Sequence, residues 1–299
     1  MRVRAYCSSA NLGPGYDLMG IALDAFHDVV DVELVSGRGY ARVVEVRGPY
    51  ASSIPLGEMN SAAEAARAAL RIAEQRMDAI IRIWKGVPPR RGLGSSGASA
   101  AATVKAIDEA LGGILSEDDL VRAASEGERA ASGSPHADNV APSLIGGLVV
   151  LGDEIIRFRP DFRFLLLIPW VEVPESKTGY MRSVIPRDVP FEKFMKHCSH
   201  LSLLLLGLAL GDARMFGEGM SYSFVDEVRA SLIPGLDELK REALNLGALG
   251  ASISGAGPAI LILCEECDAI SEGMRNKCRE LGIPATVVET SPAEGASAV

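Results

Sequence analysis

The fifteen residues from Pro88 to Ala102, which read PPRRGLGSSGASAAA, have the composition of a phosphate-binding loop. Their glycines allow the backbone to approach a ligand closely. Two adjacent serines, Ser95 and Ser96, add hydroxyl groups for phosphate oxygens or a metal ion. Where such a stretch enters a helix, unpaired N–H groups and the positive end of the helix dipole face an anion. These residue types predict an anion site at a helix N-terminus.

An ordinary helix capped by serine after a glycine-rich loop would have the same composition, so the stretch alone leaves both interpretations open. The lysine and Ser/Thr that end the Walker nucleotide-binding motif are missing. Any phosphate that binds here is therefore held by backbone amides and serines.

Two polar loops carry further groups that could bind a small molecule. Asn11 and Asp17 enclose two glycines and a proline, a composition that suits a rigid polar wall around a ligand or an ordinary solvated turn. His136, Asp138 and Asn139 lie within four residues of one another. Capping of a short helix after Asn139 would explain one of these three.

Strands and helices must position these groups. Residues 79–84 alternate like a strand and residues 98–110 are alanine-rich like a helix, so the loop joins strand to helix. Asn60 is expected to cap a helix that runs to about residue 75. Ser116 to Asp119 has the form of a capping box for a helix to about residue 131. Glu126 and Glu128 lie on its later turns, where glutamate is usually exposed.

The first half should also contain strands over residues 3–7, 29–35 and 42–47, the last two joined as a hairpin by the turn at Gly37–Gly39. A second unit is expected to begin at Arg157. Its predicted elements are strands at 164–168, 251–254, 259–263 and 285–289 and helices at 190–210, 225–232, 236–246 and 268–281. Helices against an antiparallel or mixed sheet make the fold α+β, with domains at 1–156 and 157–299.

Composition limits the class of partner. The chain has 299 residues and a net charge of −9, which argues against a nucleic-acid-binding surface. The N-terminus has no apolar leader, and the longest apolar run, Leu201 to Leu210, is about half the length of a membrane span. We therefore expect a cytoplasmic protein whose partners are small molecules or protein, without nucleic acid or membrane.

The cysteines do not predict a disulfide framework. Five is an odd number, so reduced thiols are the simplest interpretation, and Cys264 and Cys267 form a lone C-x-x-C without the context of a zinc or redox site. His197 and His200 flank Cys198 on a predicted helix. This trio could bind a metal, but surface or packing roles are the usual ones for such residues.

Taken in order, the glycine-rich stretches resemble the GHMP kinases, a superfamily of small-molecule kinases. Pro88 to Ala102 looks like their phosphate loop P-x-x-x-G-L-G-S-S-A-A, with Gly97 in place of the first alanine, and Ser252 to Pro258 looks like their third motif. Ser9 to Asp17 and His136 to Pro142 resemble the homoserine kinases of that superfamily in particular. The resemblance spans nearly the whole chain.

The resemblance implies a two-domain fold. Its N-terminal α/β domain would contain a left-handed β-α-β unit with the phosphate loop, and its C-terminal domain would be a ferredoxin-like α+β domain. The implied reaction transfers the γ-phosphoryl group of ATP to the hydroxyl of L-homoserine, on the route to threonine. Phosphoryl transfer asks a protein mainly to align donor and acceptor and to neutralise charge.

By similarity, Ser96 and Glu128 would hold Mg²⁺, a hard ion that accepts a hydroxyl, a carboxylate and phosphate oxygens. The residues implied for the nucleotide are Pro88, Arg90, Arg91, Gly92, Leu93, Gly94, Ser95, Ser96, Gly97, Ala98 and Asn60. Arg90 and Arg91 are expected to lie near the phosphates without carrying most of the charge.

The acceptor must offer partners to an ammonium, a carboxylate and a hydroxyl. The residues implied for homoserine are Asn11, Asp17, His136, Asp138, Thr178, Arg182, Arg229 and Gly255. Asp17 or Asp138 suits the ammonium, whereas Arg182 and Arg229 suit the carboxylate because guanidinium binds it bidentately. A buried arginine that pairs structurally at the domain interface is the alternative for each.

Four residues are implied for catalysis: Asp138, Asn139, Ser96 and Glu128. In mevalonate-type relatives an aspartate is the base, and Asn139 falls near its place. An amide cannot take a proton, so direct transfer of the hydroxyl proton to a γ-phosphate oxygen is one hypothesis. A carboxylate base, Asp138 or Asp17, is the other.

Three further expectations follow from the resemblance. A kinase for another alcohol, such as mevalonate or shikimate, is the nearest alternative. A catalytically silent nucleotide-binding regulator is the alternative from another class. Because members of the superfamily are often dimers, a homodimer is the expected assembly.

Overall fold

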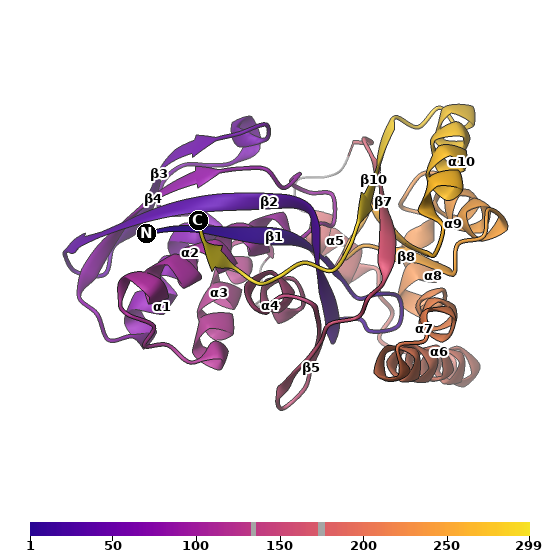
Figure 1. Cartoon of the computed structure of the whole chain (residues 1–299), viewed down its shortest axis with the longest axis horizontal. Coiled ribbons are helices and arrows are strands. Elements are labelled where there is room, and N and C mark those ends of the chain that lie inside the picture. The colour runs from indigo at the N-terminus through magenta and orange to yellow at the C-terminus, as the bar shows by residue number, and fades with distance from the viewer. Residues whose placement is uncertain (133–135, 173–176) are drawn as a thin grey trace.

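The structure is a computed structural model that describes residues 1–132, 136–172 and 177–299, with the side chains of 130–132, 177 and 178 left out. Seven strands of the described chain form the first sheet, ordered β11-β1-β2-β4-β3 with β5 and β6 continuing from β2 (Figure 1). They are β1 (Arg2–Ala10), β2 (Met19–Ser36), β3 (Ala41–Arg47), β4 (Met77–Trp84), β5 (Leu148–Leu151), β6 (Ile155–Phe158) and β11 (Ser297–Ala298).

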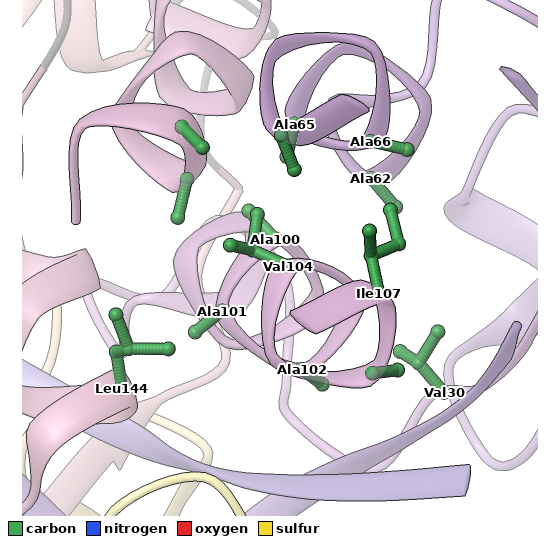
Figure 2. Packing of buried hydrophobic residues seen from close by; sticks show 14 of the residues in the cluster. Val30, Ala62, Ala65, Ala66, Ala100, Ala101, Ala102, Val104, Ile107 and Leu144 are labelled. Carbon is green, nitrogen blue, oxygen red and sulfur yellow. The ribbon is translucent and has the colours of Figure 1, made fainter. Parts of the chain in front are cut away.

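Helices cover one face of this sheet (Figure 1). They are α1 (Ser61–Ile72), α2 (Ser95–Ala110), α3 (Glu117–Ser132) and α4 (Ala137–Ile145), preceded by the short 3₁₀ turn η1 (Ala51–Ser53). Figure 2 shows Ala100 and Ala101 of α2 facing Ala65 of α1 and Leu144 of α4. Because the side chains at these contacts are small, α2 packs closely between its neighbours and the sheet. The helix that carries the phosphate loop is thereby fixed in the core.

The predicted hairpin between residues 29–35 and 42–47 is wrong. β4 lies between β2 and β3, antiparallel to β2 and parallel to β3. Asp78, at the start of β4, accepts hydrogen bonds from the backbone N–H groups of Arg38, Gly39 and Tyr40. The turn after β2 therefore wraps around the start of β4 instead of closing a hairpin.

The second sheet has the order β10-β7-β9-β8 in the described chain. Its strands are β7 (Arg163–Pro169), β8 (Gly250–Ile253), β9 (Ile260–Cys264) and β10 (Ala285–Thr290). The helices of this half are α5 (Lys177–Ser183), α6 (Phe191–Leu210), α7 (Ala213–Met220), α8 (Phe224–Ala230), α9 (Leu236–Asn245) and α10 (Cys267–Glu280). With α5 to α8 placed between β7 and α9, the succession β7-α9-β8-β9-α10-β10 with this strand order is ferredoxin-like. The α+β prediction is thus confirmed.

The end of the chain returns to the first sheet. β11 pairs with β1, and Gly146 and Leu23 form bridges to Glu294 and Pro292. Figure 1 shows the N- and C-termini next to each other over this sheet. The predicted boundary between residues 156 and 157 falls inside β6. The first sheet therefore includes residues from both predicted domains.

The interpretation of all five cysteines as free thiols is wrong for one pair. Cys264 and Cys267 form a disulfide with a Cα–Cα distance of 5.3 Å. Both are buried where β9 ends and α10 begins, and that turn brings the two side chains within bonding range. Cys7, Cys198 and Cys278 are free.

The histidines of α6 have packing roles. His197 lies against Phe224, with ring centroids 4.7 Å apart, and His200 Nδ1 lies 2.9 Å from the carbonyl oxygen of Glu218. No group of three or more potential metal-binding side chains occurs in the described part of the chain. Nor does that part contain a helix long and apolar enough to cross a membrane.

Candidate functional site

Residues from both halves of the chain line a cavity of about 810 Å³, a volume typical of small-molecule sites. The predicted site residues in its lining are Asn11, Asp17, Asn60, Arg90, Gly92, Leu93, Gly94, Ser95, Ser96, Glu128, His136, Asp138, Asn139, Arg182, Arg229 and Gly255. Stretches more than 200 residues apart in sequence, around Asn11 and Gly255, thus meet in one place.

The glycine-rich loop opens α2, as predicted. Gly94 occupies the N-cap position with φ 61°, and Ser95 is the first helical residue. A Cβ at Gly94 would lie 2.0 Å from Ser8 Oγ, and one at Gly92 would lie 2.1 Å from the carbonyl oxygen of Ser254. Both glycines are therefore required by close packing as well as by positive φ. The first amides of α2 are left at the cavity, where an anion can bind.

The spacing from Gly92 to Gly97 also fits the dinucleotide pattern G-x-G-x-x-G. That pattern needs a helix followed by a parallel strand. Here α2 is followed by α3, so the dinucleotide-binding fold is not formed.

The third glycine-rich stretch supports the phosphate loop from the second sheet. Ser254 Oγ donates to the carbonyl oxygen of Gly92 at 2.7 Å, and the N–H of Ala259 donates to the carbonyl oxygen of Arg91 at 3.1 Å. Asn11 Nδ2 donates to the carbonyl oxygen of Gly255 at 3.0 Å. The two motifs therefore form one rigid wall of the cavity.

Four residues predicted for the nucleotide lie outside the described lining of the cavity: Pro88, Arg91, Gly97 and Ala98. Ala98 is fully buried in the core. Arg91 Nη1 donates to the carbonyl oxygens of Pro169 and Val171, and its guanidinium lies 5.1 Å from the Trp170 ring centroid. We therefore assign Arg91 to the junction between the two sheets.

Asn60 has the capping role that its sequence context predicts. Its Oδ1 accepts from the N–H of Ala62 at 2.9 Å, and its Nδ2 donates to the carbonyl oxygen of Pro55 at 2.7 Å. It also lines the cavity. Asn60 thus fixes the start of α1 at the cavity wall.

Glu128 lies opposite the start of α2. Its environment differs from the usual one, since glutamates on a helix are mostly exposed. It is buried and hydrogen-bonded with Ser96. Burial raises the pKa of its carboxyl, while Ser96 and the positive charge of Lys85 act in the opposite direction. A carboxylate and a hydroxyl beside a phosphate loop are a donor set that suits Mg²⁺.

At the other end of the cavity, Asn139 lies inside α4, so the interpretation as a helix-capping residue is wrong. α4 begins at Ala137, with His136 at its N-cap position. Ser8 Oγ lies 3.1 Å from Asn139 Oδ1 and 3.0 Å from its carbonyl oxygen. Asn139 thereby connects α4 to β1 beside the phosphate loop.

Asp138 is the most perturbed acid of the site. It is buried, and its Oδ1 has no hydrogen-bond partner among the described residues. Burial, with the negative charges of Asp17 and Glu128, raises the pKa of Asp138 to about 7. A carboxyl group with this pKa can exchange a proton near neutral pH.

Asp17 and Arg182 form a bidentate ion pair, with both N–O distances 2.8 Å. Arg182 Nη2 also lies 3.2 Å from His136 Nδ1. Burial and the charge of Arg182 lower the pKa of His136. Asp17 has φ 58°, and its N–H donates to Asn11 Oδ1 at 3.2 Å. The loop before β2 thus holds the Asp17 carboxylate against the Arg182 guanidinium at the cavity.

Arg229 is buried and bonded to backbone. Its Nε donates to the carbonyl oxygen of Met181 at 3.0 Å, and its Nη1 donates to that of Gly255 at 3.2 Å. Tyr16, which the sequence did not single out, lies beneath both arginines, with its ring centroid 5.2 Å from Arg229 and 5.3 Å from Arg182. Its position next to Asp17 was the available signal.

Lys85 is the second functional-site residue that sequence reasoning missed. It lines the cavity immediately after β4 and is almost completely buried. A lysine at the end of an alternating strand usually reaches solvent, so nothing in the sequence marked it. Thr178 lies in α5, but its side chain is outside the described residues.

Comparison with known proteins places these features in a family. Residues 60–147 match the model of the GHMP kinases N terminal domain, and residues 204–280 match that of the GHMP kinases C terminal. The first match contains the phosphate loop and Glu128.

Curated relatives match over the whole chain. A homoserine kinase of Aeropyrum pernix is 42% identical, with 100% of this chain and 98% of the relative covered. One of Thermoplasma acidophilum is 41% identical, with coverage of 98% and 94%. The solved structure of homoserine kinase from Cytophaga hutchinsonii has a TM-score of 0.90 at 31% identity, with 100% of this chain and 97% of that chain covered.

Proposed function

The chain belongs to the GHMP kinases, and from that premise we propose that it transfers the γ-phosphoryl group of ATP to the hydroxyl of L-homoserine. The product would be O-phospho-L-homoserine, an intermediate on the route to threonine. The observation that carries the choice of acceptor is the Asp17–Arg182 ion pair in the wall of a cavity that also contains the phosphate loop. The names of the full-length relatives support the same acceptor.

Homoserine has an ammonium and a carboxylate on one carbon, and the two charges of the pair match them. The substrate ammonium would replace Arg182 at Asp17, and the substrate carboxylate would take the guanidinium of Arg182. Arg229, held by Tyr16 and two backbone carbonyls, lies in the same lining as a second carboxylate partner. Mevalonate and shikimate have no ammonium group. They would therefore leave the Asp17 carboxylate without a positively charged partner and would use only part of the hydrogen-bonding capacity of Arg182.

The donor end would bind the triphosphate at the N-terminus of α2. Backbone amides and the hydroxyl of Ser96 would supply hydrogen bonds, and the loop from Ser254 to Ala259 holds that backbone in place. Ser96 and Glu128 would hold Mg²⁺, which neutralises charge on the phosphoryl oxygens when it is bound. Alignment by rigid elements is the main contribution that this reaction needs from a protein.

The hydroxyl proton needs an acceptor, and we assign Asp138 to that role. Asn139 is an amide held by Ser8 and cannot take a proton. The Asp138 carboxyl is buried, with a pKa of about 7, close to the value at which a general base works best at neutral pH. Asp17 and Asp138 would thus divide the work, Asp17 binding the ammonium and Asp138 the proton.

Nucleotide consumption with a panel of acceptors tests the proposal. The purified chain is assayed for ADP release with L-homoserine, mevalonate and shikimate at equal concentrations. We expect ADP release with homoserine alone. Equal or greater ADP release with another alcohol would show that the chain has a different substrate. Tight ATP binding without ADP release would support a catalytically silent regulator.

A further inference from the structure

A buried ion pair lies directly beneath the phosphate loop. Lys85 follows β4, and Asp28 lies in the middle of β2. Their exposed fractions are 1% and 0%, so both charges are removed from water. Neither residue belongs to the glycine-rich stretches that match the superfamily's motifs.

Lys85 uses all of its donors inside the protein. Its Nζ contacts the Asp28 carboxylate, Ser99 Oγ at 2.8 Å and the carbonyl oxygen of Ser95 at 2.5 Å. An ammonium group has three N–H donors, so this set of acceptors is complete. One of the three is the first helical residue of α2.

Asp28 gathers the other side of the same network. Its Oδ1 accepts from the N–H groups of Gly86 and Val87, both at 3.0 Å, and its Oδ2 accepts from Ser99 Oγ at 2.6 Å. Ser95 Oγ in turn donates to the carbonyl oxygen of Val87 at 2.9 Å. The start of α2 is therefore tied to the segment after β4 through Ser95, and to the Lys85–Asp28 pair through Ser99.

A buried ion pair is weak evidence for stability, because well-packed apolar side chains often stabilise a fold equally well. What apolar side chains cannot do is hold the carbonyl of Ser95 and bring a positive charge close to a phosphate site. The charge of Lys85 reaches the cavity, since it acts on the buried carboxyl of Glu128. The pair is thus placed to affect the ligand end of α2.

We propose that the Lys85–Asp28 pair is a positioning device for the phosphate loop. It holds the first turn of α2 so that its amides and Ser96 face the triphosphate. Of its two charges, the positive one of Lys85 lines the cavity, beneath a loop that has no Walker lysine. Lys85 and Asp28 are positioning residues, because they act through Ser95 and Ser99. The inference rests on the proposed function only in that the cavity must bind a nucleotide.

The test separates nucleotide affinity from folding stability. Lys85→Met alone leaves Asp28 buried without its partner and should lower Tm. The double variant Lys85→Met with Asp28→Asn removes both charges, and we expect its Tm to return to within roughly 3 °C of wild type. Lys105→Met is the matched control, because Lys105 is a partly exposed lysine of α2 that is also paired with carboxylates, those of Asp108 and Glu109.

Calorimetric titration with MgADP gives the decisive reading. We expect the double variant to bind MgADP at least ~10-fold more weakly than wild type, a loss of about 1.4 kcal/mol. The KM for ATP should rise while the KM for homoserine changes less than about twofold, and the control should match wild type in both. A double variant of wild-type stability that binds MgADP like wild type would overturn the proposal.

Two further outcomes need their own measurement: a double variant that does not fold, and a wild-type protein that does not phosphorylate homoserine. If the double variant does not fold, Ser99→Ala replaces it, since that change removes the hydroxyl shared by Lys85 and Asp28. It should weaken MgADP binding by roughly threefold, and unchanged binding would contradict the proposal. Wild type that binds MgADP without phosphorylating homoserine would refute the proposed acceptor and leave this inference standing.

Discussion

Burial separates the roles of two carboxyl groups at the acceptor end of the cavity. Asp138 is enclosed and its pKa is raised to about 7, mainly because its charged form loses contact with water. Asp17 is partly exposed and bonded to Arg182. The sequence identified both residues as candidates but could not divide their roles, because burial depends on residues that are distant along the chain.

Replacing Asp138 tests its role as proton acceptor. The unprotonated form is the active one, so wild-type kcat/KM should fall as pH decreases through about 7. Asp138→Asn should lower kcat by roughly 10²-fold or more and remove this acid limb. The measurement is a pH–rate profile of both proteins. If the variant kept most of its activity and the same limb, direct transfer to the γ-phosphate would be the better account.

The same substitution should change stability in a pH-dependent way. The folded-state pKa of Asp138 lies above its unfolded value, so the unfolded chain holds fewer protons between pH 4 and 7 and native stability falls as pH rises through that window. Asp138→Asn should therefore raise Tm relative to wild type at pH 8. The corresponding gain in the free energy of unfolding is a few kcal/mol, since one pKa unit corresponds to about 1.4 kcal/mol. The difference should nearly vanish at pH 4. A gain that is equally large at pH 4 would contradict this explanation.

Ser96 should act on the metal requirement. Ser96→Ala is expected to raise the Mg²⁺ concentration for half-maximal turnover by roughly tenfold, because it removes a hydroxyl ligand. Ser95→Ala is the control, since Ser95 Oγ is occupied by the carbonyl of Val87. Titration of activity with Mg²⁺ at fixed ATP checks the prediction. An unchanged requirement in Ser96→Ala would show that another group binds the ion.

At the scale of elements, the local sequence predicted which helices and strands form better than it predicted which of them lie next to each other. Alternation and alanine content placed β4 and α2 correctly, and Asn60 was recognised as a cap, because these signals depend on nearby residues. The pairing of β3 with β4 was missed because strand order depends on packing across the sheet. The start of α4 was placed after Asn139 instead of at Ala137, since a polar run resembles a loop.

Gly97 allows a test of how α2 is built. A Cβ there would contact Asn139 and Val140 at 3.5 Å, an ordinary distance, and the residue does not have positive φ. Gly97→Ala should therefore stabilise the protein by about 0.5–1 kcal/mol, seen as a higher midpoint of urea unfolding, without loss of activity. Gly94→Ala, with its close contacts to Ser8 and Asn139, should do the reverse. A destabilised Gly97→Ala variant would mean that the contact is tighter than described.

At the scale of the molecule, the cavity is assembled from segments that no local pattern connects. Asn11, Glu128, Arg182 and Gly255 come from four separate regions, and only the motif resemblance indicated that they meet. Lys85 was missed because its role depends on an ion pair with Asp28 in β2, which is distant along the chain. The return of β11 to the first sheet was missed for the same reason. The homodimer stays a prediction.

The identity of the product tests the central claim most directly. The chain is incubated with ATP, Mg²⁺ and L-homoserine, and the mixture is followed by phosphorus NMR together with quantification of ADP. We predict a phosphate monoester on the homoserine hydroxyl, formed in equal amount to ADP. Release of ADP with inorganic phosphate and no such ester, or no ADP release at all, would contradict the account.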